Sequence, residues 1–252
     1  MRLKGKVALI TGGATSIGRE IVRAFVQEGA ATGFIDIREK ESRALVAELS
    51  AQGPCHFCHG DITKESDCVA AVREVESRFG PITVLVNNAA RFVFKGYDAP
   101  LEDWRASFEV NVFGTALITR AVVESMKRAG SGAIVNTGSI SSFIAQPGIV
   151  VYNATKAALV EMTRCFAMDL APFDIRVNCI CPGYIVSPAL ATFAADNGKT
   201  FEEIDKELSQ QTILKRLGRP EEIAKCVVFL SSDDASYVTG AYLMADGGLT
   251  AL

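Results

Sequence analysis

Tyr152 and Lys156 stand four residues apart in the run Tyr152-Asn153-Ala154-Thr155-Lys156, and Ser139 lies thirteen residues upstream. The following residues are typical of a helix, where positions i and i+4 share one face, so the phenol and the ammonium point the same way. A free tyrosine has a pKa of about 10, which a nearby positive charge lowers by roughly 1–3 units. Such a phenol can exchange a proton with an alcohol or a ketone near neutral pH, while Ser139 holds the substrate oxygen.

A lone Tyr-x-x-x-Lys pair is more often just two solvated residues of a helix, so other parts of the chain decide its meaning. The apolar run Val7–Ile10 leads into Thr11-Gly12-Gly13-Ala14-Thr15-Ser16-Ile17-Gly18, and a helical pattern follows from Arg19 to Glu28. Glycines allow a tight turn, and the free N–H groups at the start of a helix bind a pyrophosphate. This pattern predicts pyrophosphate contacts along the turn, from Gly12, Thr15, Ser16, Ile17 and Gly18.

Asp36 extends the pattern to a dinucleotide. It ends a second apolar run, Thr32–Ile35, and lies eighteen residues after Gly18, close to the spacing at which an acid binds the adenosine ribose. The alternative is that Asp36 only caps the helix beginning near Glu39. A carboxylate repels a 2′-phosphate, so we expect NAD as the cofactor, and the oxidised nicotinamide ring adds a second positive charge near Tyr152. Arg38 could soften this preference, but it would act alone.

The chain is similar, over essentially its whole length, to the classical branch of the short-chain dehydrogenase/reductase family. The resemblance rests on motifs in the family's order. Besides the glycine-rich turn, they are Asp61-Ile62, Asn87-Asn88-Ala89-Ala90, Asn111, Ser139, Tyr152 with Lys156, Arg176-Val177-Asn178, Pro182-Gly183-Tyr184-Ile185 and Asp246-Gly247-Gly248.

The resemblance implies a catalytic tetrad of Asn111, Ser139, Tyr152 and Lys156, with the asparagine orienting a water that links the lysine to solvent. It also implies hydride transfer on the pro-S face and a usual homotetramer. The implied cofactor contacts run along the chain. They are Asp36 and Ile37 at the adenosine ribose, Asp61 and Ile62 at the adenine, Asn88, Ala89 and Ala90 near the adenosine-side ribose, Tyr152 and Lys156 at the nicotinamide ribose, and Pro182, Gly183, Ile185 and Ser187 at the carboxamide.

Three positions depart from the family pattern. Ser16 replaces the middle glycine of the turn, Ala90 replaces the glycine that ends the Asn-Asn-Ala-Gly motif, and Ser187 replaces a threonine. None of them removes a reacting group. Ser16 adds a β-carbon where the backbone approaches the pyrophosphate, although its hydroxyl can donate to a phosphate.

Strand and helix patterns alternate along the chain, without an internal repeat or a linker. Short apolar runs without polar alternation are typical of strands covered on both faces. We therefore expect one α/β domain over residues 1–252, a Rossmann-like, doubly wound sheet of seven parallel strands. The expected strands are Val7–Ile10, Thr32–Ile35, Cys55–Cys58, Val84–Val86, Ala133–Asn136, Arg176–Ile180 and Ala241–Met244, and the expected helices include Glu39–Ala51, Lys64–Phe79, Val110–Arg128, Tyr152–Asp169 and Glu221–Leu230.

Composition excludes several other classes. The chain has 252 residues, 49% hydrophobic and 22% charged, with a net charge of −3, which indicates a folded domain without a basic field for nucleic acid. The N-terminal apolar run is too short for an export signal, and the longest uncharged tract, Ala129 to Thr155, is too polar for a membrane span. Seven scattered cysteines favour a reducing compartment, so we expect a cytoplasmic protein.

Cys55-His56-Phe57-Cys58-His59 formally matches a haem-attachment motif. We interpret it instead as an ordinary strand before Asp61, since alternation sends Cys55, Phe57 and His59 to one face and His56 and Cys58 to the other. We expect no metal there.

The two helices expected at Val110–Arg128 and Tyr152–Leu170 carry apolar residues all round. Such helices are buried on more than one side. We expect one side to meet the sheet and the other to meet a partner subunit, as in the family's tetramers, rather than burial within one chain.

The substrate pocket is expected between four segments: Arg91–Phe94, Ser141 with Gln146, Tyr184, and a mobile lid at about 188–214. With Ser139 and Tyr152, this lining fits a secondary alcohol such as a sugar, a polyol or a cyclic diol, and its ketone. A 3-oxoacyl-carrier-protein reductase and a nucleotide-binding regulator without catalysis remain alternatives. Asp36 and the acidic balance of charge weigh against the first, and the intact tetrad weighs against the second.

Overall fold

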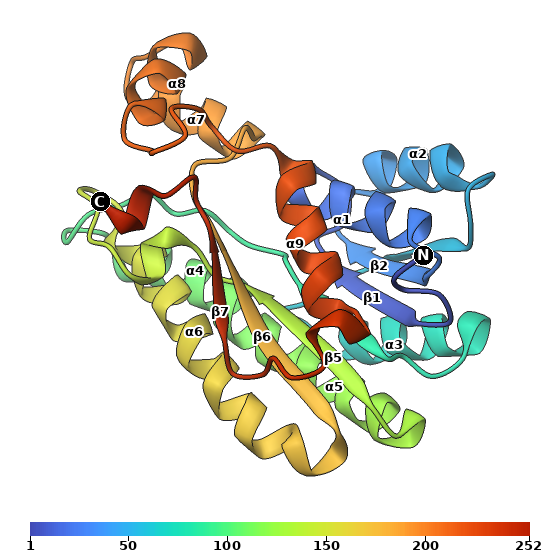
Figure 1. The fold of residues 1–252 in the computed structure, drawn as a ribbon. Coiled ribbons are helices and arrows are strands. Elements are labelled where there is room, and N and C mark those ends of the chain that lie inside the picture. The colour runs from blue at the N-terminus through green and yellow to red at the C-terminus, as the bar shows by residue number, and fades with distance from the viewer.

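The computed structural model describes all residues, 1–252, and contains one sheet of seven parallel strands (Figure 1). The strands pair in the order β3-β2-β1-β4-β5-β6-β7, which confirms the predicted doubly wound sheet. The runs predicted as strands lie within two residues of their observed ends. The strands are β1 Val7–Thr11, β2 Ala31–Asp36, β3 Cys55–His59, β4 Val84–Asn87, β5 Gly132–Thr137, β6 Ile175–Pro182 and β7 Tyr242–Ala245.

The α-helices cover the sheet and add a small unit beyond it. They are α1 Ser16–Gln27, α2 Glu39–Leu49, α3 Glu65–Phe79, α4 Leu101–Phe108, α5 Thr115–Ala129, α6 Val150–Leu170, α7 Pro188–Asp196, α8 Phe201–Ser209 and α9 Pro220–Ser231.

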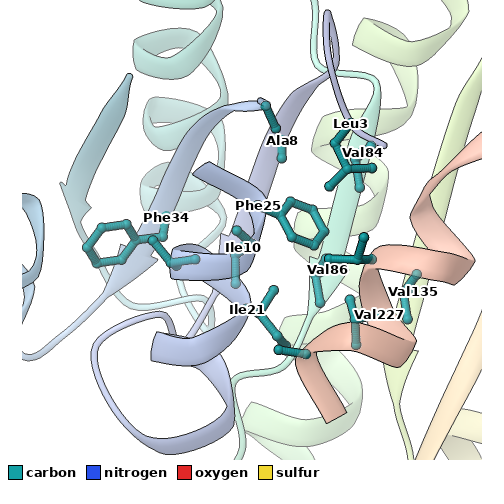
Figure 2. Packing of buried hydrophobic residues seen from close by; sticks show 14 of the residues in the cluster. Leu3, Ala8, Ile10, Ile21, Phe25, Phe34, Val84, Val86, Val135 and Val227 are labelled. Atoms are coloured by element: carbon teal, nitrogen blue, oxygen red, sulfur yellow. The ribbon is translucent and has the colours of Figure 1, made fainter. Parts of the chain in front are cut away.

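Side chains of successive strand residues pack against opposite layers of helices. Ile10 and Val86 meet Phe25 of α1 and Val227 of α9, which lie side by side (Figures 1 and 2). The neighbouring Leu9 of β1 packs in a second cluster, whose members include Leu85, Ile134, Val75 of α3, Val122 of α5 and Ala167 of α6. Because both faces are covered, most strand residues are apolar and do not alternate with polar ones.

The order of the strands reverses beside β1, which pairs with both β2 and β4. The chain leaves β1 towards β2 on one side, whereas β4 continues towards β5 on the other. In open α/β sheets, ligands bind at such a switch point, outside the carboxyl ends of the strands. The glycine-rich turn after β1 and the segment after β4 lie there.

The helix predicted to begin at Val110 begins nine residues earlier. A continuous helical segment runs from Leu101 to Ala129, with a π-helical turn at Glu109–Gly114 between α4 and α5. By length and composition alone this segment could cross a membrane. Its residues Ile118 and Val122 are fully buried in the core cluster that contacts the sheet, so it packs as a core helix of this domain.

The segment predicted as a lid forms two short helices, α7 and α8, which project beyond the ends of the strands (Figure 1). They have a small apolar core of their own, in which Ala194 of α7 packs with Ile204 and Leu208 of α8. A backbone bridge between Ile185 and Gly218 closes the base of this unit. That this helical unit acts as a mobile lid stays a prediction.

Candidate active site

Tyr152, Lys156 and Ser139 lie together at the carboxyl end of β5. Ser139 follows that strand by two residues, and α6 presents Tyr152 and Lys156 one turn apart. Tyr152 is 8% exposed and Lys156 is 2% exposed. The Lys156 ammonium donates to the backbone oxygen of Thr137 over 2.6 Å, and its nitrogen lies 5.6 Å from the centre of the Tyr152 ring. The predicted reacting groups therefore share one buried site.

Burial controls the protonation of this site. It raises the pKa of Tyr152, and a hydrogen bond with Ser139 offsets only part of that rise. Burial also lowers the pKa of Lys156 to about 8. We expected Lys156 to lower the pKa of the phenol, whereas burial, the largest influence on that pKa, raises it. The phenol is therefore harder to ionise here than in water.

Asn111 lies in the π-helical turn and joins two segments of the site. Its Oδ1 accepts from the backbone N–H of Arg91 over 2.7 Å, and its Nδ2 donates to the Arg91 oxygen and to Thr155 Oγ1, each over 3.0 Å. Thr155 in turn donates to the backbone oxygen of Tyr152. Both amide hydrogens have protein acceptors, so this side chain positions the start of α6, and the expected water would need another atom of the residue.

Thr155 and Thr137 are functional positions that sequence reasoning did not single out. Thr155 connects Asn111 to α6, and Thr137 supplies the acceptor for Lys156. The place of Thr155 between Tyr152 and Lys156 was a usable signal. Nothing in the sequence marked Thr137, because a backbone oxygen carries no residue-specific pattern.

The glycine-rich turn is shaped to receive a phosphate group. Gly12 has φ +68°, and a β-carbon on it would lie 2.7 Å from Ala89 Cα, while one on Gly18 would lie 1.9 Å from the Gly12 oxygen. The first N–H groups of α1, including Ile17, have no acceptor within the helix. A turn closed to side chains and rich in free donors fits the pyrophosphate of a dinucleotide.

Ser16, the departure at the middle of this turn, takes a left-handed conformation with φ +51°. That region suits glycine and costs a residue with a β-carbon about 1–2 kcal/mol. The turn therefore holds Ser16 in a conformation that suits the glycine of the family pattern.

Asp36 and Arg38 border the turn at the end of β2. The Asp36 carboxylate accepts from the backbone N–H groups of Ala14 and Arg38, each over 2.9 Å. The Arg38 guanidinium donates to Thr15 Oγ1 over 2.7 Å. Asp36 thus faces the turn, as a ribose-binding acid should, and Arg38 lies across the same opening. The helix α2 is preceded by Arg38 and not by Asp36.

The residues after β3 and β4 mostly shape the pocket from behind. Asn88 donates to the oxygens of Thr11 and Gly12, so its side chain holds the glycine-rich turn instead of extending to a ribose. Asp61 accepts from the backbone and hydroxyl of Thr63. The Ile62 side chain is buried in the core, which leaves only its backbone for an adenine. Ala89 packs against Gly12, and Ala90 follows it.

The segment after β6 forms the remaining wall. Gly183, after Pro182, lies close to Asp246. A β-carbon on Gly183 would lie 2.6 Å from the Cα of Asp246. Ile185 is buried. Ser187 Oγ accepts from the Leu190 N–H over 3.2 Å and caps α7, so its own O–H hydrogen is free to donate.

The predicted substrate residues also meet. Ser141 donates to Gln146 Oε1 over 2.6 Å. Burial raises the pKa of Tyr184, and a hydrogen bond between Tyr184 and Gln146 partly opposes that rise. The Tyr184 hydroxyl donates to Gln211 Oε1 over 3.2 Å. Gln211 lies in the predicted lid but was not named as a contact.

The cysteine- and histidine-rich segment is strand β3 with the predicted alternation. Phe57 packs against one core cluster, and Cys58 belongs to the other. His56, Cys58 and Glu74 place one possible ligand atom each within 4.8 Å of one another. The contact present is a 2.6 Å hydrogen bond between His56 and Glu74, and burial, helped by Glu74, raises the pKa of Cys58 to about 12. The absence of a metal stays a prediction.

Comparison with known proteins agrees with this geometry. Residues 12–250 match the sequence model of a family described as enoyl-(acyl carrier protein) reductase. The chain is 38% identical over 252 residues to cyclopentanol dehydrogenase of Comamonas sp. (strain NCIMB 9872), covering 99% of each chain. It is 39% identical over 251 residues to 3-alpha-(or 20-beta)-hydroxysteroid dehydrogenase of Mycobacterium tuberculosis (strain ATCC 25618 / H37Rv), covering 99% of this chain and 91% of that protein.

A third relative differs in its cofactor. The NADP-dependent (R)-specific alcohol dehydrogenase of Lentilactobacillus kefiri is 37% identical over 258 residues, covering 99% of this chain and 98% of that protein. These relatives are all oxidoreductases, and the identity extends over the whole chain. With its seven-stranded sheet and its grouped Ser139, Tyr152 and Lys156, this chain belongs to the short-chain dehydrogenase/reductase family.

Proposed function

We propose that the protein is an NAD(H)-dependent oxidoreductase that interconverts a secondary alcohol and its ketone, with Tyr152 as the acid/base. One observation carries the proposal: Tyr152 and Lys156 are almost fully buried beside Ser139, at the edge of the sheet where the glycine-rich turn also lies. A phenol removed from water beside an ammonium is suited to proton exchange and has little structural purpose.

Each side chain then has a defined task. When bound, the nicotinamide ring supplies the hydride acceptor or donor and, in its oxidised form, a positive charge. Ser139 holds the substrate oxygen with its hydroxyl. Lys156 adds its charge to the site, and Tyr152 takes the hydroxyl proton during oxidation or returns it during reduction. Since burial raises the pKa of Tyr152, the phenol ionises only when these positive charges act together.

Asp36 supports NAD over NADP. Its carboxylate faces the glycine-rich turn, through the Ala14 contact, where a 2′-phosphate would meet a like charge. Two such charges about 4 Å apart repel by roughly 1 kcal/mol in water and about 4 kcal/mol at an effective dielectric of 20. Arg38 is the opposing feature, because its guanidinium lies near Thr15 and could pair with a phosphate. The fixed carboxylate favours NAD by at least roughly a hundredfold.

Two relatives support the substrate class by name, since cyclopentanol and hydroxysteroids carry secondary hydroxyls. A second candidate is a 3-oxoacyl-carrier-protein reductase, which shares only the acyl carrier with the description of the matching family model, because an enoyl reductase reduces a carbon–carbon double bond and not a ketone. Such an enzyme needs NADPH and an approach for an acidic carrier, and Asp36 and the net charge of −3 weigh against both.

A substrate panel distinguishes these functions by nicotinamide absorbance. We expect oxidation of secondary alcohols with NAD and little reduction of an acetoacetyl thioester with NADPH. The reverse pattern would favour the carrier-protein reductase. Cofactor binding without turnover of any alcohol or ketone would favour the non-catalytic regulator.

The same proposal includes a homotetramer in the cytoplasm. The two helical segments expected at interfaces leave apolar side chains exposed, among them Phe113 in the π-helical turn and Met168 of α6. A second copy of the chain would cover them. All seven cysteines are free, as is usual in a reducing compartment.

A further inference from the structure

Three phenylalanines form a connected aromatic wall around Tyr152. Phe92 stacks on the Tyr152 ring with 5.3 Å between centroids and 24° between planes, and Phe94 meets the same ring edge-on at 5.8 Å. Phe193 of α7 then meets Phe94 edge-on at 5.3 Å. The wall therefore runs from the projecting α7–α8 unit to the acid/base without interruption.

The other side chains expected to line the pocket are polar and bond to one another in pairs. Ser141 donates to Gln146, and Tyr184 donates to Gln211. Because both hydroxyl hydrogens are engaged, these side chains can meet a substrate hydroxyl only through the two hydroxyl oxygens and the two glutamine amide nitrogens. None of these four side chains is charged, so nothing among them would hold a carboxylate or a phosphate.

Phe92 also has room to contact a ligand. It is 48% exposed although one face of its ring rests on Tyr152. A large apolar side chain that is left half open at the entrance of a buried site gains by covering that surface. Aromatic rings pack best against flat apolar groups, stacked or edge-on.

We propose that the substrate carries its hydroxyl or keto carbon in, or directly beside, an uncharged apolar ring, alicyclic or aryl, which packs against Phe92 and Phe94 while Phe193 closes over it. This inference rests on the proposed function and narrows it: sugars, open polyols and hydroxy acids are disfavoured, and ring alcohols and ring ketones are preferred. Ser139 and Tyr152 act on the hydroxyl or keto oxygen of the substrate, and the three phenylalanines select its ring.

The wild-type protein provides the first test. Cyclopentanol, cyclohexanol and 1-phenylethanol are compared with 2-pentanol, sorbitol and lactate, all with NAD. We expect kcat/KM for the ring alcohols to exceed that for 2-pentanol by about tenfold or more. Equal or better turnover of 2-pentanol, sorbitol or lactate would overturn the ring inference and leave the proposed function standing. No turnover of any alcohol, with NAD or NADP, would overturn both.

Variants of the wall provide the second test. Phe92→Ala and Phe94→Ala should raise KM for ring alcohols by about tenfold or more and by more than they raise KM for 2-pentanol, so that the ratio of kcat/KM between the two substrates falls. Phe94→Leu keeps an apolar side chain, so a folded protein with a reduced ring preference is expected there too. Phe173→Ala is the matched control, because Phe173 is similarly exposed but lies before β6, where it stacks with Lys127. A ring preference that survives Phe92→Ala and Phe94→Leu would contradict the inference.

Discussion

The ammonium of Lys156 donates to the backbone oxygen of Thr137 over 2.6 Å, at a position almost closed to water. This places a positive charge where solvation is poor, and its pKa falls to about 8 from 10.5. A charge buried in this way lowers the free energy of unfolding and is typical of a catalytic site. The site therefore predicts a conflict between activity and stability at Lys156.

Lys156→Met, which keeps the length and removes the charge, should stabilise the fold at pH 7 and abolish activity. Lys156 binds its proton more tightly in the unfolded chain than in the folded one. The loss of folding stability that this causes is therefore complete below pH 8 and disappears as the pH rises towards 10.5. The pKa of Lys156 falls from 10.5 to about 8, which sets an upper bound of about 3 kcal/mol on the gain in unfolding free energy. Urea unfolding at pH 7 and pH 10 measures it, with Lys127→Met as the surface control. A variant less stable than wild type at pH 7 would count against this reading.

Ser16→Gly should stabilise the glycine-rich turn. Ser16 has φ +51°, and glycine removes the strain of its β-carbon, worth about 1 kcal/mol. Thr15→Gly is the neighbouring control, because Thr15 has φ −142° and no strain to lose, so it should be neutral or destabilising. Denaturant midpoints decide the matter: equal shifts for the two variants would mean that the serine is unstrained.

Asp36→Ala should raise efficiency with NADP and lower it with NAD, since the repulsion and the ribose contact disappear together. Arg38→Ala should lower catalytic efficiency with NADP and leave efficiency with NAD unchanged, because the Arg38 guanidinium, which lies beside Thr15, could pair only with the 2′-phosphate. Catalytic efficiencies with both cofactors give the answer. Comparable efficiency with NAD and NADP in the unmutated protein would disprove the assignment and move the carrier-protein reductase ahead.

The protein should behave as a homotetramer in light scattering at micromolar concentration. Phe113 and Met168 lie on the two helical segments that we expect at the interfaces. Phe113→Glu and Met168→Glu should shift the population to smaller species by burying a charge at a contact. A stable wild-type monomer would mean that a single chain tolerates these exposed side chains.

The positions of the strands along the chain were predictable because local apolar runs, such as Val7–Ile10, mark strands covered on both faces. The start of the helix before Asn111 was predicted wrongly. Pro100 precedes Leu101 and two acidic residues, a usual start signal that the more apolar stretch after Val110 obscured. The π-helical turn keeps the two parts continuous.

Contacts between distant segments could not be predicted. The side chain of Asn111 is engaged by Arg91 and Thr155, and that of Asn88 by the turn after β1, through distances in space that sequence spacing does not encode. The pKa of Tyr152 was expected to fall, yet burial raises it, because desolvation depends on every segment that covers the ring. The aromatic wall likewise joins Phe94 to Phe193, 99 residues away.

The central claim is that Tyr152 is the acid/base, and Tyr152→Phe tests it most directly. Turnover of a secondary alcohol and NAD(H) affinity by fluorescence are measured in the same preparations, with Tyr237→Phe, a fully exposed site, as control. The role of Tyr152 as acid/base requires that Tyr152→Phe lower kcat by at least about a hundredfold while cofactor affinity changes by less than about threefold, and that wild-type oxidation speed up as pH rises. A Tyr152→Phe variant that keeps about a tenth or more of the wild-type rate would contradict it.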